Sequence, residues 1–247
     1  MESLFFALLG AIFGSFINVV IYRLPRKMQG EAISLSWPPS FCPHCRARIK
    51  ARDNIPLVGW LWLRGRSRCC QKRISVRYPA IEALMALLFA VVIAQDGANL
   101  TALLMLALLS LLVAMCFIDI DHMLLPDVLT YPFMLLALIY AWSRQPLLLT
   151  LQEHALAAAV GFLILWLLNY VFVRSRGCDG IGGGDMKLFA GIGAWHGLPV
   201  LFDIMLIAAL IGLAGGLLLF RATRQQPFPF GPAIIIASVG WAMVHSQ

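Results

Sequence analysis

The sequence predicts an all-α polytopic membrane protein with one small polar insert, and three observations support this fold class. Hydrophobic residues make up 61% of the 247 residues and charged residues only 13%, against about 45–50% and about 25% in soluble domains. The mean hydropathy is +0.84. Residues 23–77 carry 13 of the 19 Lys and Arg residues against two acids, a net charge of +11. Together these values exclude a soluble globular domain, a disordered chain and a coiled coil.

Eight apolar segments are candidates for membrane-spanning helices. They lie at about 3–22, 79–95, 100–118, 128–142, 155–173, 186–199, 200–220 and 231–246. A helix needs about 20 apolar residues to cross the hydrocarbon layer, so the second, fourth, sixth and eighth segments are short. The Gly-rich sixth segment is the weakest candidate, and seven spans is the alternative count.

The basic insert sets the predicted orientation. The positive-inside rule puts it in the cytoplasm and the N-terminus outside. The inner connections are then 23–78, 119–127, 174–185 and 221–230. The first segment is not read as a cleaved signal, because its basic residues follow the apolar run. We expect three parts: a first transmembrane helix at 1–22, a cytoplasmic basic cysteine-containing domain at 23–78, and a transmembrane core at 79–247.

Four of the six cysteines lie in the insert, at Cys42, Cys45, Cys69 and Cys70. The first two form a CxxC knuckle, which binds Zn²⁺ through two thiolates. The second pair is damaged, because Ser67 stands where a second CxxC would begin. Cys70 with Cys69, or with a hydroxyl or water at Ser67, can complete a tetrahedron, and His44 is a further candidate. A metal would offset the small core of this insert.

Two arguments weigh against this metal site. Adjacent cysteines are awkward ligands for a single ion, because their side chains diverge. Four reduced thiols with structural roles are the alternative, since disulfides are rare in the cytoplasm.

The first acidic cluster closes the third apolar segment and contains Asp119, Asp121 and Asp127. Residues two apart on a helix point in nearly opposite directions. Asp119 and Asp121 therefore cannot both face one groove unless the helix has ended. Asp127 follows a proline and opens the next segment, where a carboxylate favoured by the helix dipole is the plain interpretation.

The second acidic cluster is the glycine-rich run Gly180–Lys187, which contains Asp185. Its glycines allow a close approach to another segment. A phosphate-binding loop is disfavoured, because the spacing of that motif is missing and no strand precedes it. A flexible loop with a capping aspartate is the simpler alternative.

Two carboxylates from different helices can form an aspartyl dyad. Side by side they share one proton, because both cannot easily ionise. The ionised group takes a proton from water while the other donates a hydrogen bond to the carbonyl under attack. The spacing alone does not show that the two acids meet.

The sequence resembles the type 4 prepilin peptidases of bacterial inner membranes over nearly its whole length. The matching blocks are Gly14–Pro25, Cys42–Cys45, Asn54–Leu57, Arg77–Glu82, Asp119–Asp127, Gly184–Leu188 and Pro229–Pro232. Each block alone is weak, whereas their order and spacing together are highly specific.

The resemblance implies an aspartyl protease of the GxGD type with Asp119 and Asp185 as catalytic residues. Asp119 lies seven residues ahead of the proline of the Pro-Asp pair, as in the family, and Asp121 is the fallback. Similar enzymes cut prepilins or pseudopilins after a glycine at the cytoplasmic face, for type IV pili or type II secretion. Many then methylate the new N-terminus with S-adenosylmethionine.

One departure from the family concerns the insert, where many members carry two CxxC pairs. Aligned on Arg77–Pro79, Cys70 matches the last cysteine, Ser67 replaces the third, and Cys69 can replace it by a local shift. The missing cysteine at position 67 weakens the expectation of zinc binding, and with it the expectation of methyl transfer. No S-adenosylmethionine fingerprint is visible, so the cofactor-binding residues stay unassigned. Asn18 either serves one of the reactions or bonds to a neighbouring helix.

Other functions fit less well. A peptidase without methyltransferase activity generally lacks such an insert. A transporter needs acids near mid-membrane and an internal repeat, and a zinc-ribbon assembly factor would not need Asp119 or Asp185. We expect prepilin precursors and membrane lipid as partners, with acidic head groups facing the insert. We expect no nucleic acid, and the oligomeric state is open.

Overall fold

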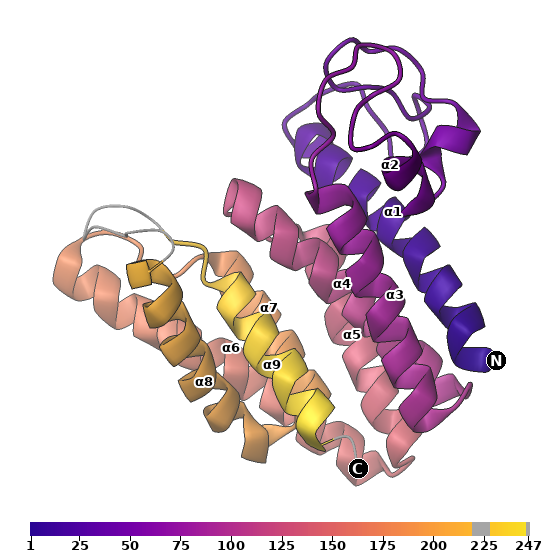
Figure 1. Cartoon of the computed structure of the whole chain (residues 1–247). Coiled ribbons are helices and arrows are strands. Elements are labelled where there is room, and N and C mark those ends of the chain that lie inside the picture. Colours follow the sequence, from indigo (N-terminus) through magenta and orange to yellow (C-terminus); the bar gives the residue numbers. More distant parts are fainter. Residues whose placement is uncertain (219–227, 246–247) are drawn as a thin grey trace. The chain divides into compact units, whose positions relative to one another are not determined.

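The computed structural model describes residues 1–218 and 228–245, and within those ranges it contains helices and no strand. The chain divides into two compact units, Met1–Leu106 and Ala107–Gln247. Figure 1 shows the helices in chain order from indigo to yellow. The predicted all-α class is confirmed.

The first unit is built on two packed helices, α1 (Glu2–Met28) and α3 (Arg77–Asp96). Small residues let their backbones approach closely, as is common between helices in membranes. A Cβ atom added at Gly14 would lie 2.7 Å from the Cα atom of Glu82. The insert between them holds two short helices, η1 (Ala51–Asn54) and α2 (Val58–Trp62).

Helix α4 (Leu100–His122) begins in the first unit and ends in the second. The second unit continues with α5 (Asp127–Arg144), α6 (Leu148–Arg176), α7 (Gly183–His196), α8 (Leu198–Leu218) and α9 (Gly231–His245). Helix α7 packs mainly against α5 and α6, and α8 packs against α9.

Helix α7 is an interior helix of the second unit. Its 14 residues make it about 21 Å long, which is short of the roughly 30 Å hydrocarbon core. Met186 and every residue from Leu188 to Trp195 are buried. Gly161 on α6 permits close contact, since a Cβ atom there would lie 2.9 Å from the carbonyl oxygen of Phe189. Packing within the unit therefore fixes the start of α7, where Asp185 lies.

Each of the eight apolar segments contains a helix, but the count of eight spans is not confirmed. Among the described residues, five helices are long and apolar enough to cross a membrane: α1, α3, α4, α6 and α8. The C-terminal ends of the predicted segments 200–220 and 231–246, and most of the connection 221–230, lie outside the described residues. The domain boundaries at 22/23 and 78/79 stay predictions.

Candidate functional site

Asp119 lies in the last turn of α4, and its side chain is buried, with 4% exposure. Its Oδ2 atom accepts a hydrogen bond of 3.1 Å from the backbone N–H of Gly231. Gly231 is the first residue of α9, so the carboxylate also faces the positive end of a helix dipole. Helix α4 continues to His122, and Asp121 is exposed on it. Helix periodicity did not say which of the two acids faces the interior of the protein. The structure shows that Asp119 is buried and Asp121 is exposed.

Asp185 lies in the first turn of α7, after the N-cap residue Gly182. Its backbone N–H donates a 3.1 Å hydrogen bond to the carbonyl oxygen of Gly182. Its Oδ1 atom is buried and has no hydrogen-bond partner among the described residues. An unpaired buried oxygen is costly, so this atom is poised for a ligand, a water or a proton.

Leu125 joins the surroundings of the two acids. A Cβ atom at Gly184 would lie 2.7 Å from the Cβ atom of Leu125, and one at Gly231 would lie 3.4 Å from its Cδ1 atom. The charge of Asp119 is also near enough to act on Asp185. The structure therefore brings together the two acids that the resemblance selected.

Gly231 and Leu125 were not expected as parts of this site. The Pro229–Pro232 block was part of the resemblance but carried no assigned role. The available signal was the Pro-Phe-Gly-Pro run at the start of a predicted helix, because the first N–H groups of a helix have no partner within it.

Asp127 is the first residue of α5, in agreement with its interpretation as a helix-start carboxylate. It also forms an ion pair that the sequence did not indicate, with Lys187 Nζ at 2.6 Å from Asp127 Oδ1. The carboxylate is 55% exposed, and exposed pairs of this kind contribute about 0–1 kcal/mol. The pair links the starts of α5 and α7 beside the candidate site.

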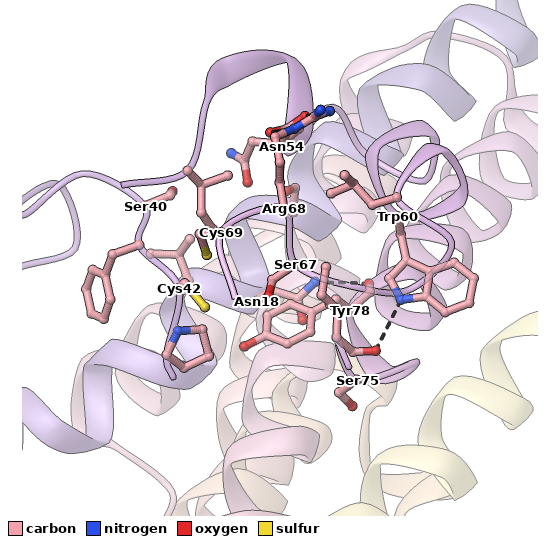
Figure 2. Close-up of a pocket in the computed structure, with 18 of the residues that line it drawn as sticks. Asn18, Ser40, Cys42, Asn54, Trp60, Ser67, Arg68, Cys69, Ser75 and Tyr78 are labelled. Carbon is pink, nitrogen blue, oxygen red and sulfur yellow. Dashed lines mark hydrogen bonds and ion pairs between the residues drawn. The ribbon is translucent and has the colours of Figure 1, made fainter. Parts of the chain in front are cut away.

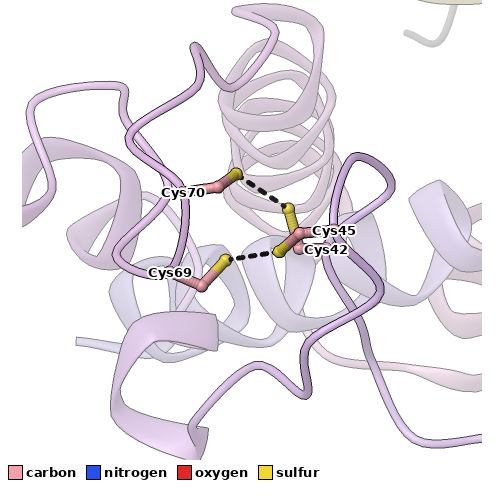
Figure 3. Close-up of side chains that lie close together, drawn as sticks. All are labelled: Cys42, Cys45, Cys69 and Cys70. Carbon is pink, nitrogen blue, oxygen red and sulfur yellow. Dashed lines mark hydrogen bonds between the residues drawn. The ribbon is translucent and has the colours of Figure 1, made fainter.

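The four insert cysteines converge on one point (Figure 3), and their Sγ atoms all lie within 4.8 Å of one another. The Cys42–Cys70 distance is 3.8 Å and the Cys45–Cys69 distance is 3.2 Å. A tetrahedral Zn²⁺ with bonds of about 2.3 Å needs sulfur atoms about 3.8 Å apart. The expected divergence of Cys69 and Cys70 was therefore wrong, and the donor set fits zinc. His44 is not part of this group.

The two halves of the cluster share one backbone fold. An isolated antiparallel bridge joins Phe41 to Arg48, and another joins Arg66 to Arg73, each seven residues apart. In the first half, Cys42 N–H donates to Ala47 and Arg46 N–H to Cys42; in the second, Ser67 N–H donates to Lys72 and Gln71 N–H to Ser67.

This equivalence explains how the damaged motif still presents four sulfur atoms. Ser67 occupies the position of Cys42, and Cys70 that of Cys45. Cys69 occupies the position of His44 and supplies the remaining sulfur. Equivalent positions in the two halves are 25 residues apart, and residues 41–48 and 66–73 share only the second cysteine and the final arginine.

The thiols of the cluster differ in acidity. Burial acts to raise the pKa of Cys42, but the backbone N–H groups of Cys45 and His44 lower it to about 6. The hydrogen bond with Cys45, followed by burial, raises the pKa of Cys69 to about 12. Thiols bind Zn²⁺ as thiolates, so a bound divalent cation would displace the protons of these groups.

A cavity of about 620 Å³ lies in the first unit beside the cysteine cluster (Figure 2). The side-chain amide of Asn18 donates a 3.1 Å hydrogen bond to the carbonyl oxygen of Tyr78 on α3. Asn18 therefore bonds to a neighbouring helix, one of the two roles considered for it, and also lines this cavity.

Comparison with known proteins gives matches along both units. Residues 8–95 match the Bacterial Peptidase A24 N-terminal domain, and residues 106–217 match the Type IV leader peptidase family. A prepilin leader peptidase/N-methyltransferase of Dickeya chrysanthemi is 41% identical, over 93% of this chain and 88% of that protein. The chain belongs to the type IV leader peptidase family.

Other members of this leader peptidase family match over similar lengths. The prepilin leader peptidase/N-methyltransferase of Aeromonas hydrophila is 42% identical, over 95% of this chain and 87% of that protein. The protein of the same name from Neisseria gonorrhoeae is 38% identical, over 95% and 87%. No solved structure gives a significant match. The chain is thus an enzyme of the type IV leader peptidase family, whose relatives here are named prepilin leader peptidase/N-methyltransferase.

Proposed function

We propose that this enzyme is an inner-membrane aspartyl peptidase that removes the leader of type 4 prepilins or pseudopilins after a glycine, at the cytoplasmic face. Asp119 and Asp185 are its catalytic residues. The observation that carries the proposal is the Asp185 Oδ1 atom, which is buried and has no partner among the described residues, near the buried carboxylate of Asp119. A loop with a capping aspartate gives no reason to bury that oxygen.

The dyad shares one proton in the resting enzyme. The ionised carboxylate takes a proton from water, and the resulting hydroxide forms a bond to the scissile carbonyl carbon. The protonated carboxyl group gives its proton to the carbonyl oxygen. Collapse of the tetrahedral intermediate returns a proton to the leaving nitrogen and breaks the C–N bond. No covalent enzyme intermediate is needed.

The second proposed activity is N-methylation of the new N-terminus. S-adenosylmethionine, when bound, would supply an electrophilic methyl group to the new N-terminal amine. The names of the relatives support this activity, since they pair the peptidase with an N-methyltransferase.

The residues that would hold zinc are Cys42, Cys45, Cys69 and Cys70. Their role is structural, because four thiolates leave no open position for substrate. Zinc would tie the two knuckles together and so stabilise an insert with few apolar contacts of its own.

Substitution of each acid tests the peptidase proposal. Asp185→Asn or Asp119→Asn removes one ionisable member of the dyad and is expected to reduce cleavage of a pilin precursor at least about 10³-fold. Asp127→Asn is the matched control, because it removes an exposed carboxylate from the start of a neighbouring helix. It should keep cleavage within about threefold of wild type.

The readout is the intact mass of the product formed by purified protein in detergent. A wild-type product heavier by one methyl, only when S-adenosylmethionine is added, supports the second activity. Cleavage that survives Asp185→Asn rules out the aspartyl mechanism. Equal loss in all three variants means that the acidic cluster has been misassigned.

A further inference from the structure

The cavity of the first unit has the size and lining of a small-molecule site. Its volume of about 620 Å³ lies in the range of about 300–1,000 Å³ typical of ligand pockets. Four aromatic residues contribute to its walls: Tyr22, Phe41, Trp60 and Tyr78. Figure 2 labels Trp60 and Tyr78 among the side chains that line the cavity. The role of this cavity follows from the charges that line it.

Glu82 supplies a buried negative charge to this cavity, with 8% exposure. Its Oε2 atom accepts a 2.7 Å hydrogen bond from the backbone N–H of Leu57. Among the described residues, no Lys or Arg forms an ion pair with it. A buried carboxylate without a cation is costly and usually functional near a membrane. A cationic ligand would remove that cost.

Backbone strain beside Glu82 supports a built site. Leu57 has φ 60 and ψ −52, a γ-turn conformation that is rare and strained. The Val58 N–H donates to the carbonyl oxygen of Pro56 at 2.6 Å, which closes this turn. Strain of this kind persists where the surroundings enforce it, and it clusters at ligand sites. Glu82 holds the turn, and Ile55 beside the turn lines the cavity.

The cavity is also lined by basic side chains. Arg48, Lys50 and Arg73 line it and are exposed to solvent. Arg68 also lines it but is already paired with Asp53, through hydrogen bonds of 2.9 and 2.8 Å. The basic residues can therefore bind a ligand's carboxylate. The aromatic wall and the buried Glu82 carboxylate can bind a positively charged group of the same ligand.

We propose that this cavity binds S-adenosylmethionine, with the sulfonium against Glu82 and the aromatic wall and the carboxylate at the basic residues. The inference rests on the proposed methyltransferase function. Glu82 recognises the permanent positive charge on the sulfur atom of S-adenosylmethionine. Glu82 is thus a binding residue for the methyl donor and has no part in peptide hydrolysis.

Equilibrium binding to the purified full chain in detergent tests the role of Glu82. Two ligands are titrated: S-adenosylmethionine, and S-adenosylhomocysteine, whose sulfur is neutral. Glu82→Gln keeps an oxygen acceptor for the Leu57 N–H but removes the charge. We expect it to weaken S-adenosylmethionine binding about tenfold or more and to leave S-adenosylhomocysteine binding within about twofold. Retained binding of the neutral ligand also shows that the variant is folded.

Glu31→Gln is the matched control, since it removes an exposed carboxylate from the same insert. It should bind both ligands as wild type does. Equal affinity of Glu82→Gln and wild type for S-adenosylmethionine, or equal loss for both ligands, overturns the assignment to Glu82.

Photo-crosslinking of radiolabelled S-adenosylmethionine to wild type locates the site without a variant. Labelled peptides are expected from the cavity segments 15–23, 40–60 and 73–82. Label in residues 107–245 contradicts the inference while leaving the methyltransferase function intact. A wild-type protein that neither binds nor transfers methyl removes that proposed function itself.

Discussion

Gly184 precedes Asp185 at the point where α7 meets Leu125. Gly184→Ala would place a Cβ atom 2.7 Å from the Leu125 Cβ atom, so the start of α7 must shift. Because Asp185 is the next residue, we expect cleavage of a pilin precursor to fall at least about tenfold, as small displacements of catalytic groups do. The rate of cleavage in detergent is the measurement.

Gly183→Ala is the matched control for this prediction. A Cβ atom at Gly183 would meet nothing within 4 Å, and alanine is the better helix former. Cleavage should stay near the wild-type rate. Similar losses in both variants would show that the loop needs glycine for flexibility and that contact with Leu125 is not the reason.

The sequence distinguishes Asp119 from Asp121 only through resemblance to a family. Helix periodicity predicts that the two side chains point in different directions, and the structure shows that Asp119 is the buried one. The hydrogen bond from Gly231 N–H connects residues 112 positions apart. No local pattern predicts a contact of that separation.

Among the elements, the two knuckles of the insert show how a substitution is compensated. Ser67 Oγ lies 3.0 Å from Cys70 Sγ, so a thiol at position 67 would reach the cluster. We expect Cys69→Ser to lose most of the bound zinc and Ser67→Cys in the same chain to restore it, because four thiolates are regained. Zinc per protein, measured by elemental analysis, is the readout.

Cys178→Ser controls for general loss of a thiol, since Cys178 is exposed and outside the cluster. It should keep the wild-type zinc content. Wild-type protein that purifies without zinc would contradict the metal proposal, and failure of Ser67→Cys to restore zinc would contradict the equivalence of the knuckles.

For the whole molecule, the charge distribution predicts the orientation in the membrane. Cys178 lies between α6 and α7 beside Arg174 and Arg176, in a connection expected to face the cytoplasm. Leu147 lies between α5 and α6, is exposed, and is expected outside. An impermeant maleimide should label Leu147→Cys in spheroplasts, whereas Cys178 should react only after permeabilisation.

Leu147→Cys is labelled in a Cys178→Ser background and Cys178 in the otherwise unchanged chain, and the labelled peptide is identified by mass because Cys45 and Cys69 are also exposed. Reaction of Cys178 in intact spheroplasts would reverse the orientation and move the candidate catalytic face away from the cytoplasm. The predicted orientation would then fail, because it rests on the positive-inside rule.

The sequence by itself determined the helical membrane class and the basic insert, and it marked the four cysteines and the two acidic clusters as candidates; the resemblance selected Asp119 and Asp185. Hydropathy, charge bias and cysteine spacing are local properties, so a single chain displays them. The tertiary structure alone decided that α7 is a short interior helix, that Cys69 substitutes for Ser67, and that Gly231 contacts Asp119. It also placed Glu82 in the lining of a cavity, where no Lys or Arg among the described residues forms an ion pair with it. These features depend on contacts between distant segments, and such contacts arise from packing, which no local pattern encodes.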